Sequence, residues 1–428
     1  MFSVSAIAIV FLIIVPGFLR LPVRPIIFNL PILFALTFIA FYVQPILVSE
    51  SFLNVPVQHW LYVTQDQKNK ALTFLFAYLC FFIAGYAAFT RKVKYSHVAV
   101  THRPVTSGLL IAFFVGISFV YYVLATGGIE QFITNHREAV YKNQWSDTRE
   151  ARQVNLIRML TGFITMAGAI LGGYLYATHE KKKARHRWLY MSLPLPGTLI
   201  KIALLSRGVF ILYALFWISL TVVSKHRVKR LGIKAILLGL LVVMGIFFGL
   251  QARTGGLEGP SVLIVAASGL INGVSAFLDV YALTLDTEGG GWTRIVLELS
   301  PVPSFIFNSA YENNLTTLVH GVSAGSSAPM PFIGEIFFNV GWGGLLVAFF
   351  QGALAGIVNF NVSQSIGRDR IWWLLLFITT VHTFAYMPHS GLRAATRPFV
   401  WVSIIFFTVK FLRIILPKKN RTTSAIAD

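Results

Sequence analysis

The chain has 428 residues, of which 56% are hydrophobic and only 12% are charged, and its mean hydropathy is +0.70. These values exclude a water-soluble globule of several domains. Runs of about 17 to 25 apolar residues recur along the chain, which is the length that crosses a hydrocarbon layer roughly 30 Å thick as a helix. Because a helix satisfies its own backbone hydrogen bonds in lipid, the sequence predicts an all-α polytopic integral membrane protein with a single membrane domain, residues 1–428.

Eleven transmembrane helices are predicted. The N-terminal apolar run resembles a signal sequence, but no small-residue cleavage site follows it and Arg20 comes after it, so we interpret it as an uncleaved first span. The spans cover residues 3–19, 26–48, 71–90, 108–126, 157–177, 189–205, 208–224, 234–251, 333–358, 371–387 and 398–415. The long interval at residues 252–332 is predicted to be one large extracytoplasmic loop, since loops of this length usually bind or catalyse.

The basic residues predict the orientation of the chain. Twenty-three of the 36 Lys and Arg residues fall in alternate connections and near the C-terminus, together with only three carboxylates. The positive-inside rule therefore places these connections and a tail of residues 416–428 in the cytoplasm, and the N-terminus and the 252–332 loop on the outer side of the membrane. The net charge of +20 comes from these short cytoplasmic connections and the tail, so it indicates membrane topology and not nucleic-acid binding.

Residues 261–285 are apolar enough to suggest a twelfth span. A crossing there would move the basic C-terminal tail to the outer side, against the positive-inside rule. We therefore predict an interfacial or re-entrant helix within the large loop.

Several arginines fall on the side that is predicted to be poor in basic residues. Ionisable groups at membrane depth are costly and indicate function, and guanidinium groups from separate spans would form a fork-shaped site for a phosphate or diphosphate. The alternative is that each side chain snorkels to the headgroup layer or caps a helix, and Lys201 is interpreted in this way. The candidate diphosphate ligands are Arg137 in an outer loop, Arg207 in a hairpin, Arg253 after the eighth span, and Arg393 and Arg397 before the last span.

His320 and Glu335 are the acid/base candidates. A histidine in an outer loop exchanges protons near neutral pH, and Glu335 opens an otherwise apolar helix directly after Gly334. The alternatives are a solvated loop histidine and a helix N-terminal carboxylate stabilised by the helix dipole. No zinc-ligand spacing and no phosphate-binding Gly-Lys-Ser loop is present in the sequence, so no metal and no cofactor are predicted.

Three stretches carry a resemblance to a known family. Residues 205–209 (LSRGV) resemble an arginine at the outer end of a span pair, and residues 331–344 (PFIGEIFFNVGWGG) resemble a Pro-x-x-Gly-Glu, Asn and paired-Gly stretch after a large periplasmic loop. Arg393 and Arg397 match arginines before the last span. The chain thus resembles the Wzy-type O-antigen and capsule repeat-unit polymerases, which belong to the polyprenyl-linked GT-C glycosyltransferases.

The resemblance implies a metal-independent glycosyltransferase of the bacterial inner membrane that serves lipopolysaccharide or capsule synthesis. A growing glycan on undecaprenyl diphosphate would be transferred to a lipid-linked oligosaccharide repeat unit, and undecaprenyl diphosphate would leave. The arginines would hold the diphosphate, and Glu335 or His320 would accept the acceptor proton. The implied partners are the undecaprenyl-diphosphate-linked oligosaccharide, membrane lipids, a chain-length regulator and a flippase, with no nucleic acid.

Two other functions stay open. An O-antigen ligase uses similar donors, but its His-Asn stretch before the paired glycines is replaced here by residues 326–329 (SSAP). A flippase or transporter of lipid-linked oligosaccharide usually shows internal repeats and short loops on both sides. The large loop and the lack of a visible repeat favour the polymerase.

Overall fold

The computed structural model describes just over half of the chain. The described residues form α-helices and short turns, with no strand among them, so the all-α prediction is confirmed for this part of the chain. The prediction of eleven spans with one large loop includes residues that lie outside the described part of the chain. The described ranges are 30–38, 64–90, 104–136, 138–140, 148–178, 184–204, 211–223, 277–284, 289–300, 330–364, 368–387 and 391–415.

Five described helical stretches are long and apolar enough to cross a membrane: Asp66–Phe89, Gly108–Ala125, Arg149–Thr178, Phe332–Val362 and Leu392–Leu412. A shorter apolar helix covers Ile371–Phe384. The helices are α2 (Leu30–Phe38), α4 (Gln65–Phe89), α5 (Pro104–Ala125), α6 (Gly128–Thr134), α8 (Arg149–Thr178), α9 (Ala184–Ser192), α10 (Leu195–Ala203), α11 (Ile211–Val223), α14 (Gly291–Leu299), α17 (Phe332–Val340), the 3₁₀ turn η5 (Gly341–Gly343), α18 (Gly344–Gln364), α19 (Arg368–Tyr386) and α20 (Leu392–Ile415).

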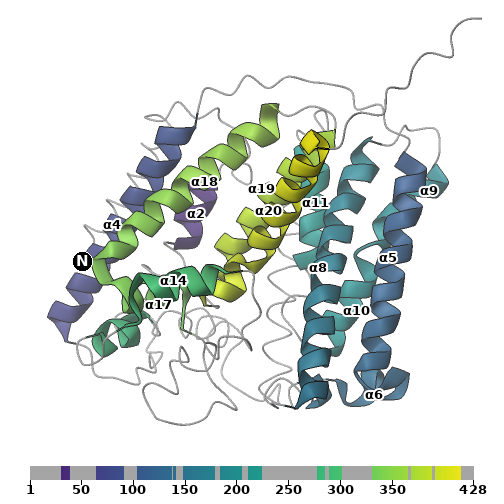
Figure 1. The fold of residues 1–428 in the computed structure, drawn as a ribbon, viewed down its shortest axis with the longest axis horizontal. Helices are drawn as coiled ribbons and strands as arrows, with labels where there is room; N and C mark the ends of the chain where they lie inside the picture. The colour runs from purple at the N-terminus through teal and green to yellow at the C-terminus, as the bar shows by residue number, and fades with distance from the viewer. Residues whose placement is uncertain are drawn as a thin grey trace, which may run out of the picture.

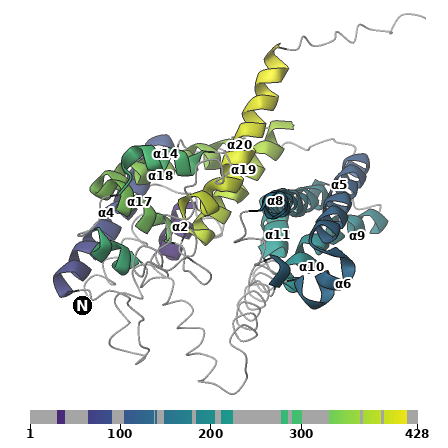
Figure 2. The same ribbon diagram turned by 60° about the horizontal axis from the view of Figure 1, so that its bottom comes forward.

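The helices form two groups that meet at α19 and α20. In Figure 1, α2, α4, α17 and α18 lie on one side, and α5, α8, α10 and α11 lie on the other, with α19 and α20 between them. Figure 2 shows the same separation from another direction. Because α19 packs against α18 and α20 and also contacts α8 and α11, it joins the two groups.

One end of the bundle gathers several helix termini, and we call it the α14 end. The helices α6, α14 and α17 lie there, at the bottom of Figure 1. The end of α19 joins the start of α17 at this place, because the Phe332 N–H donates to the Met387 carbonyl oxygen at 3.1 Å. The segments that the positive-inside rule assigns to one side of the membrane thus meet at one end of the structure.

The helices α4 and α18 pack unusually closely, although they are far apart in the sequence. A Cβ atom at Gly352 would overlap the carbonyl oxygen of Phe82, and one at Gly85 would overlap that of Phe349. Small residues that allow such backbone approach are typical of helix pairs in membranes, where no hydrophobic effect drives the helices together.

Polar side chains reinforce this helix pair. The Tyr78 hydroxyl donates to Gln351 Oε1 at 3.0 Å, and the Asn359 amide donates to the Tyr86 hydroxyl at 2.5 Å. Both bonds join α4 to α18, and Tyr78 and Tyr86 are fully buried. In a membrane interior such bonds satisfy polar groups that lipid cannot satisfy.

Two predicted spans are broken in the structure. The span predicted at residues 189–205 is two short helices, α9 and α10, because Pro194 and Pro196 lack the N–H groups that a continuous helix would need. The span predicted at residues 333–358 is α17 and α18, separated by η5, where Gly341 adopts a φ of +52° that side-chain-bearing residues rarely adopt.

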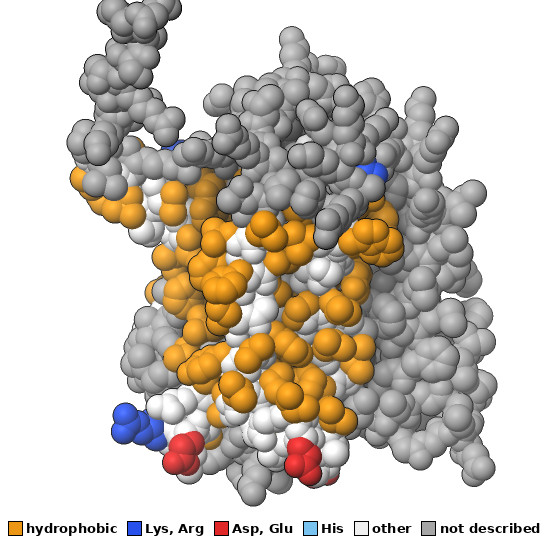
Figure 3. Space-filling view, turned by 90° about the vertical axis from the view of Figure 1, so that its right-hand side faces the viewer, with side chains coloured by type: hydrophobic (Ala, Val, Ile, Leu, Met, Phe, Trp, Pro, Cys, Tyr) orange, Lys and Arg blue, Asp and Glu red, His pale blue; other side chains and the backbone are white. Residues whose placement is uncertain are grey.

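The outward face of α5 is apolar along the helix. Its exposed side chains include Leu109, Leu110, Phe113, Phe114, Ile117, Val120 and Leu124. Figure 3 shows this apolar field, with charged side chains of the described residues only near its ends. Since 22 helical residues extend about 33 Å, α5 matches the thickness of a hydrocarbon layer.

Part of the segment predicted as an interfacial or re-entrant helix is described. Residues 277–283 are helical, and all seven are buried. Phe277 stacks on Phe74 of α4, and Tyr281 stacks on Phe337 of α17. This piece therefore packs inside the protein and not on its surface.

Candidate functional site

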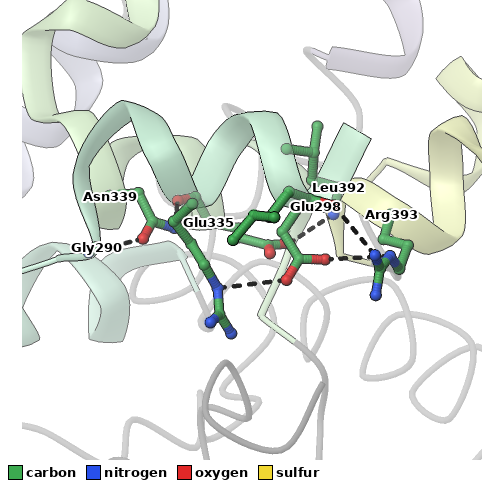
Figure 4. A network of polar contacts seen from close by, with 8 residues as sticks. Gly290, Glu298, Glu335, Asn339, Leu392 and Arg393 are labelled. Atoms are coloured by element: carbon green, nitrogen blue, oxygen red, sulfur yellow. Dashed lines mark hydrogen bonds and ion pairs between the residues drawn. The ribbon is translucent and has the colours of Figure 1, made fainter. Parts of the chain in front are cut away.

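A buried carboxylate joins α17 to α20 at the α14 end. Glu335 is 3% exposed, and its Oε2 accepts the backbone N–H of Leu392 at 2.6 Å (Figure 4). Leu392 is the first residue of α20, so its N–H has no acceptor within the helix. A carboxylate at this position is also favoured by the helix dipole.

Gly391 lets the carboxylate approach the start of α20. A Cβ atom at Gly391 would lie 2.7 Å from Glu335 Oε2, which is closer than Cβ atoms approach oxygens in proteins. The chain therefore needs a glycine at this position to keep the bond between Glu335 and Leu392.

Asn339 ties the segment before α14 to α17. Its amide donates to the Glu335 carbonyl oxygen at 2.8 Å, and its Oδ1 accepts the Gly290 N–H at 3.0 Å (Figure 4). A Cβ atom at Gly289 would overlap the Phe338 carbonyl oxygen, so this segment crosses α17 in direct backbone contact. Asn339 thus positions α14 relative to Glu335.

Glu298 on α14 is paired with two arginines. Its two oxygens lie 3.3 Å from Arg294 Nε and 3.6 Å from Arg393 Nε. The Arg393 Nη2 also donates to the Leu297 carbonyl oxygen at 3.0 Å. Glu298 is 4% exposed and Arg393 is 8% exposed, so this is a buried ion-pair network between α14 and α20 (Figure 4).

The helix α14 turns its charged side toward the protein. Trp292, Val296 and Leu299 are exposed on its other side, at the i, i+4 and i+7 positions. This distribution is typical of a helix that lies in the membrane interface with its apolar side toward lipid. Because Glu298 of α14 pairs with Arg393 of α20, α14 lies against Arg393.

Arg397 lies one turn after Arg393 and reaches toward the second helix group. Its Nη1 donates to Met159 Sδ on α8 at 3.3 Å. Arg393 and Glu298 are both close enough to act on it electrostatically. Of the predicted residues, Glu335 thus contacts the backbone at the start of α20, Arg393 pairs with Glu298, and Arg397 contacts α8, so each has a different partner.

Four other predicted site residues lie outside the described ranges: Arg137, Arg207, Arg253 and His320. Their convergence on the site stays a prediction.

Three residues of the network were missed by the sequence reasoning. The Arg294 and Glu298 pair was detectable as opposite charges at i, i+4 on an amphipathic helix. Asn339 stood within the stretch that carries the family resemblance, but no role was assigned to it.

Two arginines lie at a helix start that already holds a carboxylate. Arg393 and Arg397 occupy the first two turns of α20, where Glu335 accepts the Leu392 N–H and Glu298 pairs with Arg393. Arg397 contacts the neutral sulfur of Met159. Within the ranges described, no group of three or more His, Cys, Asp or Glu side chains is gathered that could hold a metal ion.

Comparisons with known proteins give no relative to guide the assignment. No family model matches the chain, and neither the curated proteins nor the solved structures that were compared with it contain a match.

Proposed function

We propose that the protein is a lipid-linked repeat-unit polymerase of the Wzy type in the bacterial inner membrane. In this proposal the α14 end faces the periplasm, the N-terminus is periplasmic and the C-terminus is cytoplasmic. The long apolar helices, the uneven distribution of basic residues and the arginines gathered at the α14 end support it.

The observation that carries the proposal is the fixed position of Arg393. Glu298 and the Leu297 carbonyl oxygen hold its guanidinium beside the start of α20, with Arg397 one turn further. An enzyme that expels a diphosphate must stabilise the charge that develops on it, and groups already held in place do so at least cost. Arginine is suited to this because its planar donors match phosphate oxygens.

The proposed reaction is the one that the family resemblance implies. The acceptor hydroxyl attacks the anomeric carbon of the donor glycan, the bond from that carbon to the diphosphate oxygen breaks, and undecaprenyl diphosphate leaves beside Arg393 and Arg397. The acceptor proton passes to Glu335 or His320. Because Glu335 already accepts the Leu392 N–H, this bond supports a positioning role for Glu335 and favours His320 as the proton acceptor.

The test uses purified protein in detergent with one defined undecaprenyl-diphosphate-linked repeat unit, without nucleotide. We expect a ladder of products on a gel. The Arg393→Gln variant should form it at least about 100-fold more slowly, as is typical when a donor that stabilises transition-state charge is lost.

The Lys70→Gln variant is the matched control, because Lys70 is an exposed cation on α4. A second assay measures movement of the intact substrate across liposomes. Transport without a ladder would contradict the polymerase and favour the transporter, and a ladder formed equally fast by Arg393→Gln would contradict the role of Arg393.

A further inference from the structure

The two sides of α14 meet different surroundings. Trp292, Val296 and Leu299 are exposed, and their i, i+4 and i+7 spacing places them on one side of the helix. The other side carries Ile295, which belongs to the hydrophobic core, and Glu298, which is paired with α20. The helix is thus fixed to the protein along one side and presents an apolar surface along the other.

The exposed side of α14 adjoins the 3₁₀ turn η5. The Trp342 ring of η5 is half-exposed and packs edge-on against Phe74 of α4, with 5.4 Å between the ring centroids. A Cβ atom added to Gly343 would lie 3.1 Å from Trp292 Cζ2, so the Trp292 ring lies over this glycine. Trp292 of α14 therefore reaches the residue that follows Trp342, and the two exposed tryptophans belong to neighbouring parts of the surface.

A row of exposed apolar side chains continues from Trp342 along α18. Leu346, Phe350 and Leu354 are exposed and follow Trp342 at intervals of four residues. Residues four apart are neighbours on the surface of a helix. The row lies within Phe332–Val362, a stretch that is long and apolar enough to cross a membrane. The apolar surface of α14 is thus continuous with a helix surface that is suited to acyl chains.

The direction of α14 also fits a helix at the membrane surface. In Figure 1, α14 runs across the direction of α5 and α8 instead of along it. It packs beside α17, which leads through η5 into α18, so it lies at the level where that span begins. Tryptophan is enriched at this level in membrane proteins, because its ring is apolar and its N–H favours a polar partner.

We propose that the exposed side of α14, together with Trp342, docks on the phospholipid bilayer at the boundary between headgroups and acyl chains. The inference goes beyond the proposed reaction and does not depend on it. Docking holds the pair of Glu298 and Arg393, on the protein side of α14, near the depth of the lipid headgroups. The charged group of a membrane lipid lies at the same depth.

The experiment measures the depth of α14 in a bilayer. Cys80 is the only cysteine of the chain, so Cys80→Ala provides a background for a spin label at a single new cysteine. The full-length protein is placed in phosphatidylcholine liposomes, and collisions of the label with oxygen and with a water-soluble nickel complex report its depth. Labels at Val296→Cys and Leu299→Cys should both lie about 5–10 Å into the boundary between headgroups and acyl chains.

Two other exposed positions calibrate the depth. Asp66→Cys lies two turns before Phe74 on α4, which is about 12 Å further toward the α14 end of the bundle, and its label should meet the nickel complex freely. Phe350→Cys lies about 12 Å beyond Trp342 on α18, and its label should meet oxygen and be shielded from the nickel complex. The labels on α14 should fall between these two limits.

Labels on α14 that meet the nickel complex as freely as the label at Asp66→Cys would overturn the proposal, because α14 would then lie in water. Labels that are shielded from both reagents would also overturn it, since another segment of the protein or a second copy would then cover the helix. An intermediate depth in a protein that forms no ladder would support the docking surface and still contradict the polymerase. A ladder formed by a protein whose α14 lies in water would do the reverse.

Discussion

Glu335 on α17 accepts a hydrogen bond from the backbone N–H of Leu392, 57 residues further along the chain, at 2.6 Å. The bond joins the first turn of α17 to the first residue of α20, and Arg393 follows directly. A change at Glu335 is therefore expected to reach the arginines through the backbone, even if the carboxylate never touches a substrate.

The first prediction separates a positioning role of Glu335 from a catalytic one. Glu335→Ala leaves the buried Leu392 N–H without an acceptor, which typically costs about 1–3 kcal/mol of stability. Glu335→Gln keeps an oxygen acceptor and should retain much of the stability and of the ladder formation. Thermal unfolding in detergent and the ladder assay check this. A stable Glu335→Gln variant that forms no ladder would instead identify Glu335 as the proton acceptor.

The second prediction concerns Gly391. A methyl group there would lie against Glu335 Oε2, so Gly391→Ala should lower the unfolding temperature and slow ladder formation. Gly116→Ala on α5 is the control, since no atom lies within 4 Å of a Cβ atom there. Equal unfolding temperatures for the two variants would show that the close approach at Gly391 is not needed.

The third prediction concerns the contact between α4 and α18. Gly352→Ala should destabilise the protein by about 1–3 kcal/mol, because the added methyl group would force two helix backbones apart. Gly162→Ala on α8, where a Cβ atom meets nothing within 4 Å, should not lower the unfolding temperature. Unfolding curves in the same detergent compare the two, and an unaffected Gly352→Ala variant would contradict the close packing.

The fourth prediction concerns the ion pair between Glu298 and Arg393. Removing one partner leaves the other charge buried, which costs about 3–5 kcal/mol in comparable pairs. Glu298→Gln and Arg393→Gln should each destabilise the protein, and the double variant should lose less than the two separate losses combined. A double-mutant cycle from thermal unfolding measures this coupling. Additive losses would show that the two side chains do not interact.

The fifth prediction is a dependence of stability on pH through His136, which is 2% exposed. Burial and, to a smaller extent, the Arg158 charge lower the pKa of His136 to about 4, from an ordinary value of 6.5. As the pH falls, His136 is therefore protonated at a higher pH in the unfolded chain than in the folded protein. The contribution of His136 to stability is complete above pH 6.5 and is lost progressively as the pH falls from 6.5 toward 4.

The His136→Gln variant checks this prediction. Its unfolding temperature should fall less steeply between pH 6.5 and pH 4 than that of the unchanged protein. The variant can keep a bond to the Tyr122 hydroxyl, which lies 2.9 Å from His136 Nε2, so that both proteins start from similar packing. Identical slopes would show that His136 titrates as it does in water.

Much of the helical framework could be predicted from the sequence. The apolar runs of α5, α8 and α19 are long enough to specify helices by themselves, and the structure has helices at these places. The proximity of Arg393 and Arg397 was also predictable, because residues four apart share one side of a helix. The contact between Glu335 and the backbone at the start of α20 was not predictable in this way.

The arrangement of the helices depended on contacts that no local pattern encodes. Whether Gly85 and Gly352 lie against the backbone of the opposite helix, which backbone N–H Glu335 accepts, and which arginine reaches Glu298 are all decided by how distant helices pack. In lipid every apolar helix face is equally satisfied by acyl chains, so hydropathy identifies the spans but cannot select their neighbours. Sequence determined that this chain is a membrane-embedded set of helices, and tertiary packing decided which charged groups meet, because that choice depends on small residues and buried polar partners far apart in the chain.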